Sequence, residues 1–273
     1  MIRRFTFLFA MFVAVPLLAQ ERTAIIFAVD GYHKTLEPLA MLTGAGSCES
    51  GNVGLKYSQP PNDMKYYQSG RRYRVYSAGS TAGFATVSKP QRLGCNSPGA
   101  AVALTQDVDL GIAVVDIWRM TIKAHHDDMR EPRKRELEAM GDLARRVYSI
   151  KGLAGAGKIQ STVLATDLDG DRKSDFLVTC SVMDSKFDHR LFFISMGGAL
   201  KEHGAEYVWY YAAPRDEDGT IEITFFDQAD FDCDGVDEVI LLERGKESHN
   251  YRILKRRYTG EWITVYEGGG SGC

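Results

Sequence analysis

The pattern of apolar and polar residues divides the chain into two regions of short strands with one helix between them. In residues 20–120, brief apolar runs such as "AIIFAVD" at 24–30 and "GIAVVDIW" at 111–118 alternate with turn-rich segments such as "GAGSCESGN". "RRYRVYSAG" and "GFATVS" follow each other closely enough to form a hairpin. Short strands joined by turns predict an N-terminal small β barrel or sandwich.

The spacing of the apolar residues changes after this region. Between Glu131 and Ile150 they recur every three or four residues, at Leu137, Met140, Leu143, Ala144, Val147 and Tyr148. This spacing predicts an amphipathic helix with Pro132 in its first turn. We interpret residues 121–157 as a helical connector between the two β regions.

The segment that follows the helix nearly matches a phosphate-binding loop. Gly152, Gly157 and Lys158 have the required spacing. Ile159, however, stands where Ser or Thr must contact magnesium, and a helix precedes the segment instead of a strand. We therefore expect a helix-to-strand connection and no nucleotide site.

The remaining chain contains a repeated unit. "TDLDGDRKSDFLV" at 166–178 aligns without a gap with "ADFDCDGVDEVIL" at 229–241, 63 positions later. Strand-like segments flank both copies, with "KIQSTVLA" and "TIEITFFDQ" before them and "HRLFFIS" and "YRILKRR" after them. The match predicts one supersecondary unit that occurs twice in residues 158–268, followed by a flexible tail at 269–273.

Acidic residues alternate in both loops, and this pattern is typical of a calcium site. Carboxylates at positions 1, 3 and 5 turn inward and repel one another unless a cation binds. Calcium takes about 6–8 oxygen ligands in irregular geometry, so the carbonyl at position 7 and the acid at position 9 can complete the set. The candidate ligands are Asp167, Asp169, Asp171, Lys173 and Asp175 in the first loop, and Asp230, Asp232, Asp234, Val236 and Glu238 in the second.

An EF-hand is excluded, because its position 12 requires a carboxylate and these loops have Val178 and Leu241 there. The loops instead resemble the D-x-D-G-D-G-x-x-D loop of FG-GAP (VCBS-type) repeats, which occur in integrin-like β-propellers and in secreted bacterial proteins. The resemblance covers only the C-terminal part, about residues 158–266. It implies two propeller-blade-like repeats and two bound calcium ions.

Three residues depart from the family pattern. Arg172 replaces the second glycine of the first loop, where a left-handed backbone would cost about 1–2 kcal/mol, so we expect a weaker first site. Cys233 replaces the first glycine of the second loop, and Glu238 replaces its last aspartate. Acidic turns without metal are the alternative interpretation.

A closed propeller needs about four or more blades, and the sequence has two units. We expect the units to pack as a small sheet against the helix and the N-terminal domain; oligomerisation of the chain is the alternative. The fold class is thus mainly β with one prominent helix. "EYVWYY" at 206–211 fits cross-strand core pairs better than a stacking surface for sugars.

The N-terminus has the pattern of a secretory signal peptide over residues 1–19. Arg3 and Arg4 precede an apolar run from Phe5 to Leu18 that is shorter than a membrane span, and Ala19 marks the expected cleavage point. We expect a secreted or periplasmic protein with no membrane span after cleavage; an uncleaved anchor is the alternative. In an oxidising compartment, disulfides are expected, with Cys48 and Cys95 as the first candidate pair.

Charge and motifs limit the possible functions. The net charge of −3 without a long basic tract argues against nucleic acid, and we interpret "RKR" at 133–135 and "KRR" at 255–257 as solvated faces. No G-x-S-x-G elbow occurs. The consecutive residues at 125–128, His125, His126, Asp127 and Asp128, diverge on a helix and cannot readily share one ion.

We therefore predict an exported calcium-binding β protein that is non-catalytic. Its calcium ions would rigidify the two Asp-rich loops, and its partner would be an unknown extracellular or envelope protein or glycan. The alternatives are a secreted hydrolase that acts on envelope polymers, with its site between the two β regions, and a purely structural envelope component.

Overall fold

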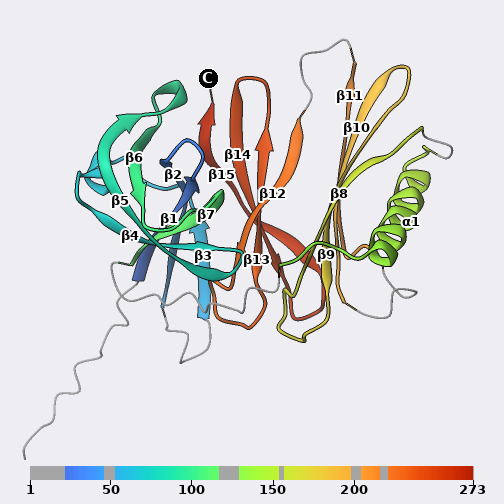
Figure 1. Cartoon of the computed structure of the whole chain (residues 1–273), viewed down its shortest axis with the longest axis horizontal. Coiled ribbons are helices and arrows are strands. Elements are labelled where there is room, and N and C mark those ends of the chain that lie inside the picture. Colours follow the sequence, from blue (N-terminus) through green and yellow to red (C-terminus); the bar gives the residue numbers. More distant parts are fainter. Residues whose placement is uncertain are drawn as a thin grey trace, which may run out of the picture.

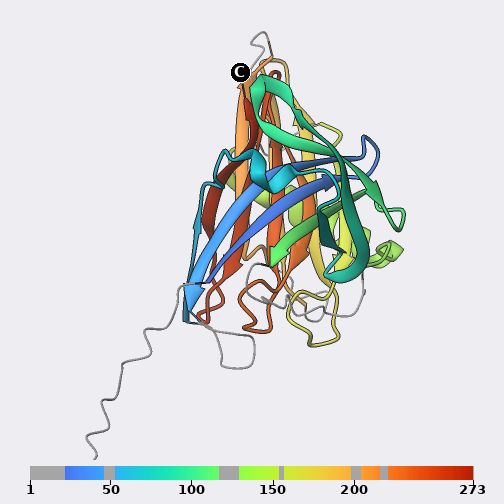
Figure 2. The same cartoon turned by 90° about the vertical axis from the view of Figure 1, so that its left-hand side faces the viewer.

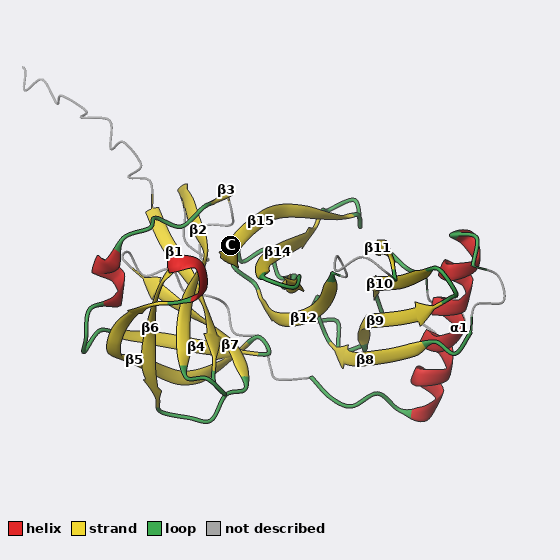
Figure 3. Cartoon of the chain, turned by 90° about the horizontal axis from the view of Figure 1, so that it is seen from above, coloured by secondary structure: helices red, strands yellow, loops and turns green. Residues whose placement is uncertain are grey.

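Three β-sheets and one helix lie in a row in the computed structural model of the chain (Figure 1). The structure describes residues 22–45, 53–116, 129–153, 157–197, 204–215 and 221–272. Seen from above, the N-terminal sheet is followed by the sheet β12–β15, then by β8–β11, and then by the helix α1 (Figure 3). A mainly β fold with one prominent helix is therefore confirmed.

The N-terminal sheet closes into a six-stranded barrel. Its strands follow the order β1-β7-β4-β5-β6-β2, β1 pairs again with β2 to close the ring, and β3 extends the sheet beyond β2 (Figure 2). The predicted hairpin forms between β4 and β5. The elements are β1 (Arg22–Asp30), β2 (Thr35–Ala45), β3 (Val53–Ser58), η1 (Met64–Tyr67), β4 (Arg72–Ser77), β5 (Ser80–Arg92), η2 (Gly94–Asn96), β6 (Pro98–Leu104) and β7 (Leu110–Asp116).

Strand β1 is apolar from Ala24 to Val29 because both of its faces are buried there. Ile25, Phe27 and Val29 point into the barrel core, whereas Ile26 and Ala28 belong to a second core outside the barrel. Since side chains alternate between the faces of a strand, a continuous apolar run is required wherever both faces are covered.

The two repeated units form two four-stranded antiparallel sheets rather than one small sheet. In each, the strands are neighbours in chain order, and the acidic loop joins the first strand to the second. The first sheet contains β8 (Gln160–Thr166), β9 (Asp175–Met183), β10 (Phe187–Ser195) and β11 (Tyr207–Pro214). The second contains β12 (Glu222–Ala229), β13 (Glu238–Arg244), β14 (Ser248–Arg256) and β15 (Trp262–Gly272).

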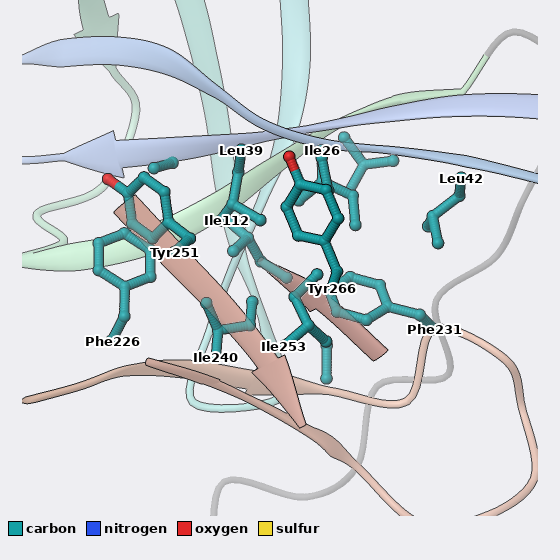
Figure 4. Close-up of a cluster of buried hydrophobic side chains, with 14 of the residues drawn as sticks. Ile26, Leu39, Leu42, Ile112, Phe226, Phe231, Ile240, Tyr251, Ile253 and Tyr266 are labelled. Atoms are coloured by element: carbon teal, nitrogen blue, oxygen red, sulfur yellow. The ribbon is translucent and has the colours of Figure 1, made fainter. Parts of the chain in front are cut away.

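Apolar cores hold the row together. Side chains of the barrel and of the second sheet meet in one cluster, which includes Ile26, Leu39, Ile240, Ile253 and Tyr266 (Figure 4). Another cluster lies between the two four-stranded sheets and includes Leu177, Phe192, Val239, Leu241 and Trp262. In both sheets the second strand thus alternates between two buried faces.

The helix α1 (Lys134–Ile150) covers the outer face of the first sheet, at the end of the row opposite the barrel (Figure 1). The predicted apolar stripe is buried except for Leu137, which is 45% exposed. Pro132 precedes the helix rather than lying in its first turn. There the Glu136 carboxylate accepts a hydrogen bond from the Arg133 backbone N–H at 2.6 Å.

Several sequence predictions lie outside the described residues: the signal peptide at 1–19, Cys48, and the segment from His125 to Asp128. The Cys48–Cys95 pairing stays a prediction. Cys180 is buried and carries a free thiol. No helix in the described part of the chain is long and apolar enough to cross a membrane.

The aromatic segment at 206–211 contributes β11, an edge strand of the first sheet. Tyr207 and Trp209 pack against the core between the two four-stranded sheets, whereas Tyr210 packs against the core under the helix. Val208 is 38% exposed. The aromatic side chains of β11 therefore cover the edges of both the core between the two sheets and the core under the helix.

Candidate metal centres

Each acidic loop brings three carboxylates together at the turn between two strands. Asp167, Asp169 and Asp175 offer oxygens that lie within 4.8 Å of one another, and Asp230, Asp232 and Glu238 do the same in the second loop. The second cluster is fully buried, and in the first only Asp169 is partly exposed. Both clusters could hold a metal ion.

Hydrogen bonds from the backbone hold the first loop in shape. The Asp171 N–H donates to Asp167 Oδ1 at 3.2 Å and to Asp169 Oδ1 at 3.3 Å. The Arg172 N–H donates to Asp167 Oδ2 at 2.8 Å. Because each carboxylate accepts a bond from the turn that it encloses, its oxygens are directed inward before any cation binds.

The second loop repeats this arrangement. The Asp234 N–H donates to Asp230 Oδ1 at 3.1 Å and to Asp232 Oδ1 at 3.3 Å, and the Gly235 N–H donates to Asp230 Oδ2 at 3.1 Å. The sequence repeat therefore extends to the hydrogen bonds of individual carboxylate oxygens.

The acid at position 9 closes each loop from the start of the following strand. Asp175 Oδ2 accepts a hydrogen bond from the Leu168 N–H at 2.7 Å, and Glu238 Oε2 accepts one from the Phe231 N–H at 2.8 Å. Burial raises the pKa of Asp175 to about 7, helped by nearby carboxylates, and raises the pKa of Glu238 well above its usual value. A cation between the carboxylates would oppose both shifts.

Position 5 lies at the outer side of each loop. Asp171 accepts a hydrogen bond from the Lys173 N–H and pairs with the Lys173 ammonium, which lowers the pKa of Asp171. Asp234 likewise accepts a hydrogen bond from the Val236 N–H. That the backbone carbonyls of Lys173 and Val236 bind calcium stays a prediction.

The glycine substitutions fall on positions with left-handed backbone. In the first loop φ is 71° at Gly170 and 65° at Arg172, and in the second it is 60° at Cys233 and 94° at Gly235. Each loop therefore has one glycine and one strained residue at its two left-handed positions, as the family pattern implied for Arg172.

The two loops are bonded to each other. The Asp237 N–H donates to the Leu168 carbonyl at 2.7 Å, and the Gln228 amide exchanges hydrogen bonds with Thr166 and donates to Asp237 Oδ2 at 3.0 Å. Both candidate centres therefore lie at the same edge of the row, side by side.

The interpretation of "KRR" at 255–257 as a solvated face is wrong for two of its residues. Lys255 and Arg256 have side chains only 24% and 23% exposed. The Lys255 ammonium contacts Asp232 Oδ2 and lies 2.8 Å from Asp234 Oδ2. Only Arg257, paired with the exposed Glu261, is 52% exposed.

A buried carboxylate outside the loops joins the second sheet to the barrel. Asp227 lies at a register shift in β12, and its Oδ1 accepts hydrogen bonds from the Ala78 N–H of the barrel at 2.7 Å and from the Gln228 N–H at 2.9 Å. Burial raises the pKa of Asp227 to about 8. No sequence motif predicts this contact, because Ala78 and Asp227 are 149 positions apart in the chain.

A cavity of about 330 Å³ lies between the barrel and the second sheet. Two histidine–carboxylate pairs line it: His33 Nδ1 lies 2.6 Å from Asp30 Oδ2, and His249 Nε2 lies 2.7 Å from Glu37 Oε1. Tyr251 also donates to Glu37. Sequence reasoning missed this site because Glu37 and His249 come from strands more than 200 positions apart.

Comparisons with known proteins place no constraint on these sites: no family model, no curated protein and no solved structure matches the chain.

Proposed function

We propose that this chain is an exported β protein in which calcium rigidifies the Asp-rich loops, and that it binds an extracellular or envelope partner without catalysing a reaction. The observation that supports the calcium part is the repeated set of backbone hydrogen bonds that directs three carboxylates toward one point in each loop.

The chemistry of the clusters favours calcium over other metals. Each cluster consists of carboxylates alone, without the histidine or cysteine ligands that zinc and other transition metals prefer. Magnesium demands a nearly regular octahedron, whereas calcium accepts irregular oxygen cages. The first loop, with buried Asp175 and partly exposed Asp169, suits a calcium ion that keeps some water ligands.

The resemblance to FG-GAP repeats suggests why the barrel and the helix lie on either side of the two four-stranded sheets. We propose that the two four-stranded sheets are blade-like units and that the barrel and the helix cover the faces that further blades cover in a closed propeller. The apolar clusters on both outer faces of the pair support this assignment.

Calcium titration of the purified protein up to millimolar concentration, with thermal melts in calcium and in a chelator, tests the proposal. Calcium modules of extracellular proteins bind at about 10⁻⁴–10⁻³ M. We expect heat of binding and a higher melting temperature in calcium. Asp142→Ala, an exposed acid on α1, serves as the control. No binding and no shift in melting temperature would refute the calcium role.

The hydrolase is a second candidate, supported by the cavity between the barrel and the second sheet. Histidine paired with carboxylate can act as a general base, and Glu37, His249 and Tyr251 form such a group. Release of soluble fragments from purified envelope polymers, lost on His249→Gln, would favour this candidate over binding.

A further inference from the structure

Different residues face the two acidic loops from the third strand of each sheet. In the first sheet Phe176, which follows Asp175, pairs with Ser195, so the next residue is Met196. In the second sheet Val239, which follows Glu238, pairs with Leu254, so the next residue is Lys255. Met196 and Lys255 are therefore equivalent positions, one apolar and one cationic.

The Lys255 side chain reaches the centre of the second cluster. Its ammonium contacts Asp232, lies 2.8 Å from Asp234 Oδ2, and lies 3.6 Å from Glu238 Oε1. Glu238 is 1% exposed, and its Oε1 accepts no hydrogen bond within the described part of the chain. The lysine charge thus lies beside this buried oxygen.

Apolar side chains of two strands line the groove that holds Lys255. It is lined by Leu55 and Tyr57 of β3 on the barrel side and by Ile263 and Val265 of β15. Apolar walls of this kind cover the methylene groups of lysine while its ammonium stays on the polar end.

The described cations near the first loop do not take an equivalent place. Lys173 pairs with Asp171 on the outer side of the loop and is 61% exposed. Arg256 Nη1 lies 3.7 Å from Asp169, but its guanidinium is engaged by Glu206 at 3.1 and 3.3 Å. Neither ion pair includes the buried Asp175.

We propose that Lys255 is a built-in counter-ion of the second loop, so that calcium binds the first loop and the charge of the second is partly offset by the protein itself. This inference rests on the proposed calcium function. To enter the second loop, calcium would have to displace an ammonium that already offsets part of the charge of its carboxylates, since two cations at this distance repel each other. The lysine would then lose its ion pairs without replacement.

Calcium stoichiometry, measured by equilibrium dialysis and calorimetry, tests the inference. The unmodified protein should bind one ion, and Lys255→Met, which copies the first sheet, should bind two, with the new site in the range of about 10⁻⁴–10⁻³ M. Lys56→Met removes another lysine from the same groove and should leave one ion. Two ions on the unmodified protein, or one on a folded Lys255→Met protein, would overturn the inference.

A second pair of variants keeps the test decisive if Lys255→Met does not fold. Asp169→Asn should abolish binding, whereas Asp232→Asn should still bind one ion. One ion on each variant would mean two equal sites and would overturn the inference while the calcium function stands. No ion on the unmodified protein or on any variant would overturn both.

Discussion

The loop at 167–175 and the loop at 230–238 are folded by equivalent hydrogen bonds, yet Met196 faces the first from its own sheet and Lys255 faces the second. The backbone of an acidic loop therefore does not decide how its charge is neutralised. On the proposal that Lys255 is a counter-ion, one residue on a neighbouring strand, outside the motif, decides whether the loop needs an ion from solution.

The surroundings of the two loops also differ. The second sheet lies between the barrel and the first sheet, so its loop is buried on two sides and lines a groove against β3. The first loop lies next to the helix and to Arg130, which bonds Ser174 at 2.6 Å and Glu136 at 2.7 Å. Burial removes water that would otherwise solvate the carboxylates of the second loop, and there the ammonium of Lys255 lies beside them.

The largest effect is expected in the apolar layers, at the equivalent residues Leu177 and Ile240. Leu177 packs between the two four-stranded sheets, and Ile240 packs against the barrel. Replacing either with alanine leaves a cavity, so we expect each to lower the free energy of unfolding by about 2–5 kcal/mol in urea denaturation.

Leu137→Ala, at an exposed position of α1, serves as the control and should change the free energy of unfolding by no more than about 0.5 kcal/mol. A large loss at Leu177 with none at Ile240, or the reverse, would show that the two repeats do not share one cooperative core.

The next effect concerns calcium and separates the loops directly. At 100 times its dissociation constant, an ion that binds only the folded chain stabilises it by about 2.7 kcal/mol. Calcium should therefore raise the melting temperature of the unmodified protein and of Asp232→Asn, but not of Asp169→Asn, in scanning calorimetry with calcium or a chelator. An equal rise in melting temperature with calcium in Asp232→Asn and Asp169→Asn would contradict the claim that only the first loop binds calcium.

The third effect is a pH dependence of stability through Asp227. Its pKa is raised from 3.8 to about 8 by burial, so between these values the folded chain holds a proton that the unfolded chain has released. The free energy of unfolding should therefore fall as pH rises through this window. Asp227→Asn cannot ionise and should reduce the fall, measured by urea denaturation at about pH 5 and about pH 8.

Asp237 should retain part of this pH dependence, because burial also raises its pKa to about 8. Asp142→Asn on the exposed face of α1 should behave like the unmodified protein. An unchanged slope in Asp227→Asn would mean that Asp227 is ionised in the folded chain.

The smallest effect is backbone strain at the sixth position of the loops, where φ is 65° at Arg172 and 94° at Gly235. Arg172→Gly should stabilise the first loop by about 1 kcal/mol, and Gly235→Ala should destabilise the second by a similar amount. A methyl group at Gly235 meets no atom within 4 Å, so its effect is conformational. If the two positions are equivalent, the urea midpoint should rise in Arg172→Gly and fall in Gly235→Ala. Changes of the same sign would contradict this equivalence.

The sequence predicted local structure well, because local structure depends on near neighbours. The helix stripe from Met140 to Tyr148, the β4–β5 hairpin and the paired acidic loops all follow from spacing within a few residues. Closure of the barrel depends instead on β1 pairing with both β2 and β7, so the sequence left a barrel and a sandwich open.

Lys255 shows why the rest could not be predicted. In the sequence it belongs to a charged run on a strand, and such runs are ordinarily solvated. Only the pairing of β13 with β14 brings its ammonium to Asp232, which is 23 positions earlier in the chain. The pair of Glu37 and His249 is more distant still, since it forms only when the second sheet packs against the barrel.

Crystals grown with millimolar calcium would show directly which loop holds an ion. We expect an ion in the first loop, bound at about 2.3–2.6 Å by oxygens of Asp167, Asp169 and Asp175, with the Lys255 ammonium in the second loop. A calcium ion in the second loop with Lys255 turned out to solvent, or a first loop without an ion, would contradict it.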